Sequence, residues 1–345
     1  MIFCTTLLWQ GGARAGELHL TWTDNADDET GYAVERRAEA DETFTEIASL
    51  GANSVSYTDV GLPDGMAFCY RVRAFNNVGF SPYSSAACAA SRSAELFAAV
   101  LPSSRSVQIE SRATAFATIF NPGPEEATAC GIAKVTNVPA SLSYQTTDPQ
   151  TNQPVGAADA PADIPPGRRQ TFVLSLTPTA LVAPIEVALD FSCSNKRPAR
   201  TIVGVNTLLF SASGLPVADV VALAATLDGN GIVDLQKLDG VGLFAVGSLN
   251  VGASADITVR ADTGSESLPL TLTVCETNTA TGACLLPATP VVTVNYEGNS
   301  QRSFAVFVQA NSIVPFDPAH NRVFVRFRDT ENSIRGETSV AVQTQ

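Results

Sequence analysis

Seven cysteines are the residues of this 345-residue chain best suited to covalent chemistry. A thiol-metal site would need closely spaced CxxC-type pairs with histidine nearby, and the sequence contains no such pair. The spacing instead favours disulfides, with buried free thiols as the alternative. The six candidates are Cys69, Cys88, Cys130, Cys193, Cys275 and Cys284, which leaves Cys4 as a free thiol or as part of a removed leader.

Two of the expected disulfides lie within hairpins. Cys69 and Cys88 are equally far from a turn at Asn77-Val78-Gly79, so antiparallel strands would place them opposite each other on an outer face. Cys275 and Cys284 flank the segment ETNTATGA, a short hairpin that a disulfide can close. Disulfides persist in oxidising surroundings, so we expect the chain to be extracellular, on the cell surface or periplasmic.

Histidine, the most frequent general base, occurs only as His19 and His320. His19 alternates out of phase with its apolar neighbours, which indicates a solvent-facing strand position. His320 lies among turn formers, Asp317 and Asn321, and the two histidines are expected in different domains. The sequence has no GxSxG motif, P-loop or dinucleotide fingerprint. We therefore expect no catalytic site, no cofactor and no enzyme activity.

Acidic clusters are the remaining candidates for chemistry. Glu125 and Glu126 follow a Pro-Gly-Pro turn, which predicts a solvated hairpin tip instead of the carboxylate pair of a glycosidase. The loop Asp24–Glu29 could offer calcium several oxygen ligands. Asp228–Asp234 resembles an EF-hand loop only faintly, because apolar residues stand at its fifth and sixth positions and Asp239 at its twelfth. For both loops we prefer a turn-forming role, so we predict no metal site.

Short alternating strands must carry these residues. In LHLTWTDNADDETGYAVERR, which begins at Leu18, the side chains of Leu18, Leu20 and Trp22 share one strand face, and Tyr32 and Val34 alternate with polar residues. A turn and another alternating strand follow in GLPDGMAFCYRVRAFNNVGFSPYS. Together these segments resemble the fibronectin type III family. The resemblance implies a two-sheet sandwich that acts as a spacer or a binding surface.

The first module is expected to span residues 1–92. Phe68 stands at the position of the family's tyrosine corner, so the hydroxyl hydrogen bond of that corner should be missing. The apolar run Ile2–Trp9 and the small-x-small triplet Ala13-Arg14-Ala15 are compatible with a cleaved leader. The interpretation that we prefer makes Thr5–Trp9 the first strand of the sandwich.

An internal repeat organises the rest of the chain. The matched pairs are Asn121 with Asn250, Gly123 with Gly252, Phe172 with Phe304, and Gly204 with Gly336. The two members of each pair are 129 to 132 residues apart, which exceeds the period of solenoid repeats. The repeat therefore predicts two further sandwich domains, residues 95–213 and 214–345. They resemble immunoglobulin-like repeats of bacterial surface and secreted proteins. Cys130 and Cys193 fall on an early and a late strand, so we expect a disulfide between the two sheets of the second domain.

Composition limits the partners. The net charge of −13, from 34 acidic and 21 basic residues, opposes binding to nucleic acid and to anionic lipid. Thr, Val, Ala, Ser, Gly and Pro are abundant, as expected for an all-β chain of three tandem sandwiches. No stretch approaches the roughly 20 apolar residues of a membrane helix.

Two functional interpretations remain. The first is a non-catalytic extracellular or cell-surface protein that spaces, displays or adheres, with an unknown protein or glycan as its ligand. The second is the accessory region of a secreted polysaccharide-acting enzyme, with carbohydrate binding as one role that such a region could have. Its candidate aromatics are Phe80, Tyr83 and Tyr144, for which we prefer a role in turn and core packing. The tripeptide Arg335-Gly336-Glu337 is not the Arg-Gly-Asp adhesion motif.

Overall fold

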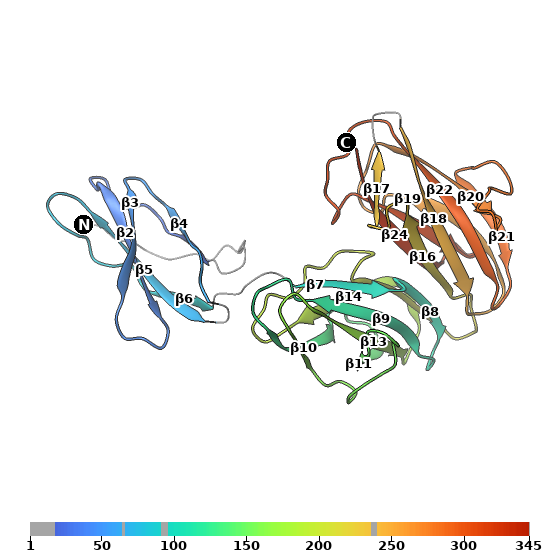
Figure 1. Cartoon of the computed structure of the whole chain (residues 1–345), viewed down its shortest axis with the longest axis horizontal. Helices are drawn as coiled ribbons and strands as arrows, with labels where there is room; N and C mark the ends of the chain where they lie inside the picture. Colours follow the sequence, from blue (N-terminus) through green and yellow to red (C-terminus); the bar gives the residue numbers. More distant parts are fainter. Residues whose placement is uncertain (1–17, 64–65, 91–95, 236–239, 345) are drawn as a thin grey trace.

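The structure of the protein is a computed structural model that describes residues 18–63, 66–90, 96–235 and 240–344. Within these ranges the chain forms strands and loops and no helix, which confirms the predicted all-β fold class. Six sheets surround three hydrophobic cores (Figure 1). We call the three parts the first, second and third sandwich; their cores are drawn from residues 18–89, 96–212 and 218–342.

The first sandwich packs a two-stranded sheet against a four-stranded sheet. The small sheet pairs β1 (Leu18–Thr21) with β4 (Ser56–Asp59), and the larger has the order β3 (Thr45–Gly51), β2 (Gly31–Ala38), β5 (Ala67–Phe75), β6 (Ala87–Ala90). The alternating side chains predicted to face inward are buried in one core, namely Leu18, Leu20, Trp22, Tyr32 and Val34. Period-two alternation therefore places the inner face of this sandwich correctly.

The predicted corner residue Phe68 is buried at the start of β5 and brings no hydroxyl group. Two residues further on, the Tyr70 hydroxyl donates a 2.8 Å hydrogen bond to Asp59 of β4, which also pairs with Arg36 at 2.8 Å. Burial, and then the hydrogen bond to Asp59, raise the pKa of Tyr70 well above its usual range. A polar bond between the two sheets is thus present beside the corner. The expected first strand, Thr5–Trp9, and the cleavage motif Ala13-Arg14-Ala15 after it lie outside the described residues.

The second and third sandwiches share one strand order. The smaller sheet of the second has the order β11 (Ala140–Thr147), β13 (Arg169–Pro178), β9 (Ala113–Phe120), β7 (Phe97–Leu101). Its larger sheet has the order β12 (Ala162–Ile164), β10 (Ala127–Lys134), β14 (Val182–Ser192), β15 (Thr207–Ser213), β8 (Ser104–Gln108). β8 pairs in parallel with β15, and the other pairs are antiparallel.

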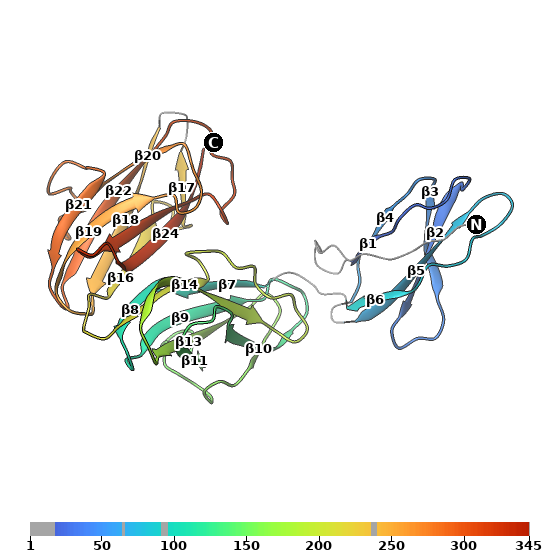
Figure 2. The same ribbon diagram turned by 180° about the vertical axis from the view of Figure 1, so that it is seen from behind.

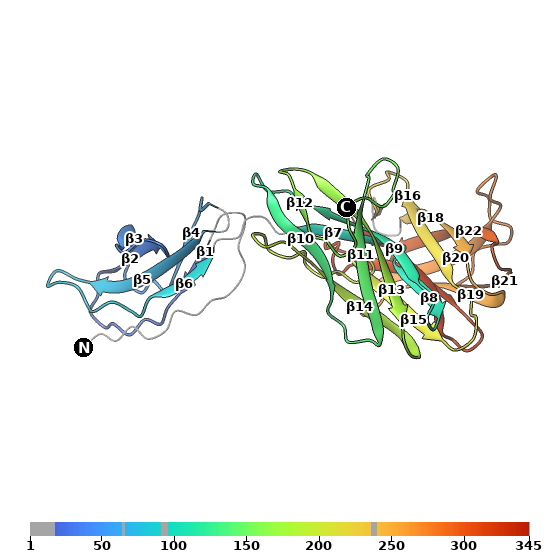
Figure 3. The ribbon, with the colours of Figure 1, turned by 90° about the horizontal axis from the view of Figure 1, so that it is seen from below.

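The third sandwich repeats this arrangement. Its smaller sheet has the order β20 (Leu270–Thr277), β22 (Gln301–Ala310), β18 (Val241–Asn250), β16 (Val220–Thr226). Its larger sheet has the order β21 (Val291–Tyr296), β19 (Ala255–Asp262), β23 (Arg322–Arg328), β24 (Ile334–Thr344), β17 (Ile232–Leu235), again with a parallel last pair. Seen from below, the second and third sandwiches lie side by side (Figure 3).

Three of the four residue pairs that match in the sequence repeat have matching structural roles; the exception is Gly204, which lies in a turn, whereas Gly336 lies in β24. Asn121 and Asn250 are fully buried at the ends of β9 and β18. Each side-chain amide donates to a turn carbonyl at 2.8 Å, and each amide oxygen accepts the N–H of the glycine two residues on. A buried amide must be satisfied in this way, which explains why the same residue recurs at both turns. Phe172 and Phe304 are likewise fully buried in their cores.

All three predicted disulfides are present. Cys69 and Cys88 are direct cross-strand partners of β5 and β6, and Cys275 and Cys284 close the hairpin after β20. The expectation that Cys130–Cys193 joins two sheets is wrong. β10 and β14 are neighbours in one sheet, and this disulfide continues their antiparallel register one step beyond Gly131 and Ser192.

The disulfides should differ in their contribution to stability. Cys130 and Cys193 are 63 residues apart and Cys275 and Cys284 only 9, so the first constrains the unfolded chain more. We expect the double variant Cys130→Ala/Cys193→Ala to lose about 4 kcal/mol and Cys275→Ala/Cys284→Ala about 3 kcal/mol of unfolding free energy. Urea unfolding of both variants measures the two losses of unfolding free energy. A larger loss in Cys275→Ala/Cys284→Ala than in Cys130→Ala/Cys193→Ala would contradict the prediction.

Candidate functional site

The two histidines lie on different sandwiches. His19 is on β1, where its ring nitrogen Nδ1 contacts the Thr58 hydroxyl at 2.9 Å. His320 lies in the loop between β22 and β23, where Nδ1 pairs with Asp317 at 2.8 Å and Nε2 lies 3.5 Å from Arg200. They cannot act on one substrate atom together.

The acidic loops use their carboxylates as internal acceptors. Asp24 accepts the Tyr32 hydroxyl and the Ala26 N–H, and Glu29 accepts the Asn53 N–H at 3.0 Å. In the second loop Asp234 accepts the Gln343 side chain, while Asp239 falls outside the described residues. Within the described ranges, no group of three or more His, Cys, Asp or Glu side chains could hold a metal ion.

The predicted carboxylate pair lies at an exposed tip. Glu125 and Glu126 follow the Asn121 turn, and both side chains are exposed. The structure uses their backbone carbonyls, which accept the side-chain amides of Asn121 and Asn195 at 2.8 Å each. Their geometry is that of a hairpin tip and not of a cleft.

The candidate aromatics of the first sandwich form a stack with arginines. The Tyr83 ring has the guanidinium carbons of Arg71 and Arg73 at 3.6 and 4.5 Å from its centroid, and Arg73 also lies 3.9 Å from the Phe80 centroid. The Glu35 carboxylate accepts the Tyr83 hydroxyl at 2.6 Å and pairs with both arginines. Burial raises the pKa of Glu35, but hydrogen bonds from Tyr83 and Arg71 outweigh it and lower that pKa. With two guanidinium groups against its ring, Tyr83 is poorly placed to stack on a sugar.

The third candidate, Tyr144, is half-buried and not a free platform. Its ring packs edge-on against Phe172, with the centroids 5.9 Å apart. Its hydroxyl oxygen lies so close to Gly131 that a Cβ there would sit 2.7 Å away. This tyrosine covers the core of the second sandwich.

A face of aromatic residues that the sequence analysis missed lies on the second sandwich. Phe97 and Leu101 of β7 stand opposite Phe120 and Phe116 of β9, on the outer side of the smaller sheet. Their exposed fractions run from 37% to 59%, and the Phe97 and Phe120 rings stack with centroids 6.4 Å apart. Strict alternation against buried Val100, Ala117 and Ile119 was the available signal. We call these four residues the aromatic face.

A set of polar contacts joins the second sandwich to the third, and we call this contact the joint. β8, the edge strand of the second sandwich, lies beside β16 and β24 (Figure 2). Asp219, directly before β16, is 3% exposed and accepts the backbone N–H of Ser106 at 2.9 Å. The same carboxylate accepts Nη2 of Arg105 at 2.8 Å and Nε at 3.0 Å. The third sandwich therefore covers a strand edge that would otherwise expose unpaired N–H groups.

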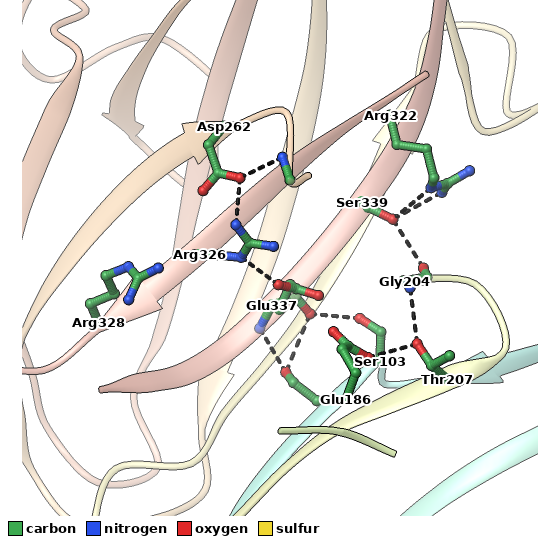
Figure 4. Close-up of polar contacts among 12 residues, drawn as sticks. Ser103, Glu186, Gly204, Thr207, Asp262, Arg322, Arg326, Arg328, Glu337 and Ser339 are labelled. Carbon is green, nitrogen blue, oxygen red and sulfur yellow. Dashed lines mark hydrogen bonds and ion pairs between the residues drawn. The ribbon is translucent and has the colours of Figure 1, made fainter. Parts of the chain in front are cut away.

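Serine side chains complete the joint (Figure 4). Ser103 donates to the Glu337 carbonyl at 2.7 Å, and the Glu337 N–H donates to the Ser104 hydroxyl at 2.6 Å. Ser339 of β24 donates to the carbonyl of Gly204, in the loop before β15, at 2.9 Å. The backbone of β24 is thus bonded to β8 through side chains in place of a continued sheet.

Two glycines allow Phe324 of β23 to be buried at the joint. A Cβ on Gly204, in the second sandwich, would lie 2.7 Å from the Phe324 ring, and a Cβ on Gly264, in the third, 2.8 Å from it. Both glycines also have left-handed backbone angles, with φ of 75° and 67°. Close approach and backbone conformation together require glycine at these positions.

Two carboxyl groups, one buried and one half-buried, face each other across the joint. Glu337 of β24 pairs with Arg326 at 2.6 Å and is 1% exposed, and Glu186 of β14 accepts the Thr207 hydroxyl at 2.7 Å. Burial and the charge of Glu186 raise the pKa of Glu337 to about 7, and burial also raises the pKa of Glu186. Glu337 Oε1 is buried without a donor among the described N–H and O–H groups. A proton held between the two carboxyl groups would satisfy it.

Of the tripeptide Arg335-Gly336-Glu337, Glu337 belongs to the joint, and the other two residues make their contacts within the third sandwich. Arg335 is 8% exposed and pairs with Asp329 at 2.6 Å. A Cβ on Gly336 would lie 2.5 Å from the Val220 carbonyl oxygen. In the sequence, the alignment of Gly204 with Gly336 in the repeat was the signal that these two glycines make close contacts, Gly204 with Phe324 and Gly336 with Val220.

No family model matches the chain, and no curated protein matches it. Among solved structures, the chicken CNTN1 FN1-FN3 domains are 10% identical, with 99% of this chain and 98% of that chain covered and a TM-score of 0.25. The fibronectin type-III domain of human fibronectin type III domain containing protein 3 is 20% identical, covering 27% of this chain and 86% of that one at a TM-score of 0.23. The twitchin kinase region from C. elegans is 20% identical, covering 25% of this chain and 15% of that one at a TM-score of 0.23. At such TM-scores the fold assignment rests on the strand order and the cores described above.

No helix that could span a membrane occurs in the described part of the chain.

The carboxyl pair should make stability depend on pH. Because folding raises both pKa values, the protonated pair stabilises the fold fully below the unfolded value of 4.5, and this stabilisation is lost as pH rises through about 7. We expect the unfolding free energy to fall by roughly 2 to 3 kcal/mol between pH 5 and pH 8. Urea unfolding across this range is the measurement.

The variant Glu186→Gln tests the cause. Its amide can donate to Glu337 without titrating, so the part of the pH dependence that comes from the charge of Glu186 should disappear and the part that comes from burial should remain. The exposed Glu266→Gln, near the same joint, is the matched control and should keep it. An unchanged slope in Glu186→Gln would contradict the assignment.

Proposed function

We propose that this chain is an exported, non-catalytic spacer and display protein, whose second and third sandwiches act as one rigid body. The observation that carries the proposal is the joint, where Asp219 bonds to both Arg105 and Ser106. A buried ion pair with additional hydrogen bonds resists opening, because separation would leave a desolvated charge unpaired. A spacer needs this property, since it must hold a distal surface in a fixed direction.

The disulfides support export. Three intrachain disulfides, each within a single sandwich, are typical of proteins that fold in oxidising compartments. The histidines and acidic pairs, in turn, serve as hydrogen-bond partners in strands and turns, which favours a display role over catalysis.

Asp219→Asn tests rigidity. Loss of the charge should leave Arg105 unpaired, destabilise the joint by about 3 kcal/mol and let the two sandwiches reorient. Small-angle scattering should show a larger radius of gyration, and a protease should cut faster between Ser213 and Val220. The exposed Asp228→Asn, the same substitution in the same sandwich, should behave like the natural chain. A natural chain that already scatters as a mixture of orientations would refute the rigid spacer.

The aromatic face favours the second candidate function, a carbohydrate-binding accessory region. Phe97 and Phe120 present stacked rings on the outer side of a sheet, and the neighbouring outward residues Ala99, Thr114 and Thr118 are small and uncharged. Such a surface suits the apolar face of a neutral polysaccharide.

Binding to insoluble neutral polysaccharides, such as cellulose and chitin, separates the two functions. If the aromatic face binds, Phe97→Ser/Phe120→Ser should reduce retention at least tenfold with little change in stability, because both residues are exposed. Phe80→Ser, also exposed but on the first sandwich, is the control. Equal retention of the natural chain, the double variant and Phe80→Ser on the polysaccharide would contradict carbohydrate binding by the aromatic face.

A further inference from the structure

A cleft of about 370 Å³ opens at the joint, between loops of the second sandwich and β23 of the third. Its size lies at the lower end of the range for small-molecule sites, about 300 to 1,000 Å³. Arg322 on β23 is its buried cation, and the exposed Arg200 and His320 meet at its edge. Thr201 and Thr263 are also part of the lining.

Arg322 is a cation without an anionic partner. It is 7% exposed, and its guanidinium donates to the Ser339 hydroxyl at 2.9 and 3.1 Å and to the Pro318 carbonyl at 2.9 Å (Figure 4 shows the Ser339 contact). No carboxylate of the described residues lies within ion-pair distance of it. Each terminal nitrogen keeps a further N–H, and two such groups form the fork that binds a carboxylate in bidentate fashion. Burial lowers the pKa of Arg322 to about 10, so an anion in the cleft would relieve an existing penalty.

The other charged groups of the cleft decide which anion fits. Arg326 is already neutralised by Asp262 and Glu337. Glu186 and the exposed Glu266 also line the cleft and would repel a dianion more than a monoanion. The cations of the cleft without an ion pair among the described residues are thus Arg322 and Arg200, beside a histidine that Asp317 holds in place.

We propose that this cleft binds a carboxylate group on a ligand about the size of one sugar, with Arg322 as the anchor and Arg200 at the edge. The ligand could be a free acid or a uronate unit of a polymer, since the recognising chemistry is the same. This binding function is independent of the spacer role, because a rigid joint does not require an occupied cleft.

Titration of the full chain with glucuronate and with glucose, followed by amide chemical shifts, tests the proposal. Glucuronate should shift amides around the cleft, and glucose should bind at least tenfold more weakly. Arg322→Met should weaken glucuronate binding at least tenfold and Arg200→Ala several-fold. Arg328→Met removes the same charge from the same strand outside the cleft and should change nothing.

The exposed Arg200→Ala keeps the test decisive even if Arg322→Met loosens the joint, because its side chain is not needed for folding. Equal binding of glucose and glucuronate, or unchanged binding in both cleft variants, would overturn the proposal. Tighter binding of glucose 6-phosphate than of glucuronate would overturn the choice of a carboxylate. Similar affinities for glucuronate and for alginate assign a free acid, and at least tenfold tighter binding of alginate assigns a polymer-borne uronate.

Discussion

The buried carboxylate of Asp219 is the constraint on which the arrangement of the second and third sandwiches depends. It is buried and needs donors, which the edge strand β8 of the neighbouring sandwich supplies through Arg105 and Ser106. Its own N–H donates to Asn250, the buried amide that also holds a turn of the third sandwich. The orientation of one sandwich is therefore tied to the interior of the other, and not merely to a surface contact.

The cleft follows from the same contact. The Ser339 hydroxyl donates to the Gly204 carbonyl across the joint and accepts a hydrogen bond from Arg322 in the cleft. The same side chain therefore holds the two sandwiches together and orients the Arg322 guanidinium. Phe324 packs between Gly204 and Gly264 and forms part of the cleft wall. A carboxylate in the cleft would bind groups that are already held in place, which lowers the entropy cost of binding.

The sequence was informative where a structural rule is local. Alternation identified the inner faces, and hairpin symmetry paired Cys69 with Cys88 and Cys275 with Cys284. It failed where pairing is not local: Cys130 and Cys193 are separated by several strands, and strand position alone did not reveal that β10 and β14 are neighbours. The joint was missed for a related reason. Alternation places Glu337 on an outer face, but nothing in the local pattern says that another domain covers that face.

The repeat explains why the outer faces carry what is specific to this chain. When the two sandwiches are matched through Gly204 and Gly336 and their strand registers, Arg322 of β23 corresponds to Glu186 of β14. By the register of β7 and β16, Phe97 corresponds in the same way to Val221. Inner positions such as Phe172 and Phe304 keep their residue because each must fill an equivalent core. Outer positions do not have to fill a core and can therefore diverge. Here the equivalent positions carry opposite charges, Glu186 in the second sandwich and Arg322 in the third, and both residues line the cleft at the joint. Sites grafted on such faces, and not the shared fold, decide what each copy of the repeat can bind.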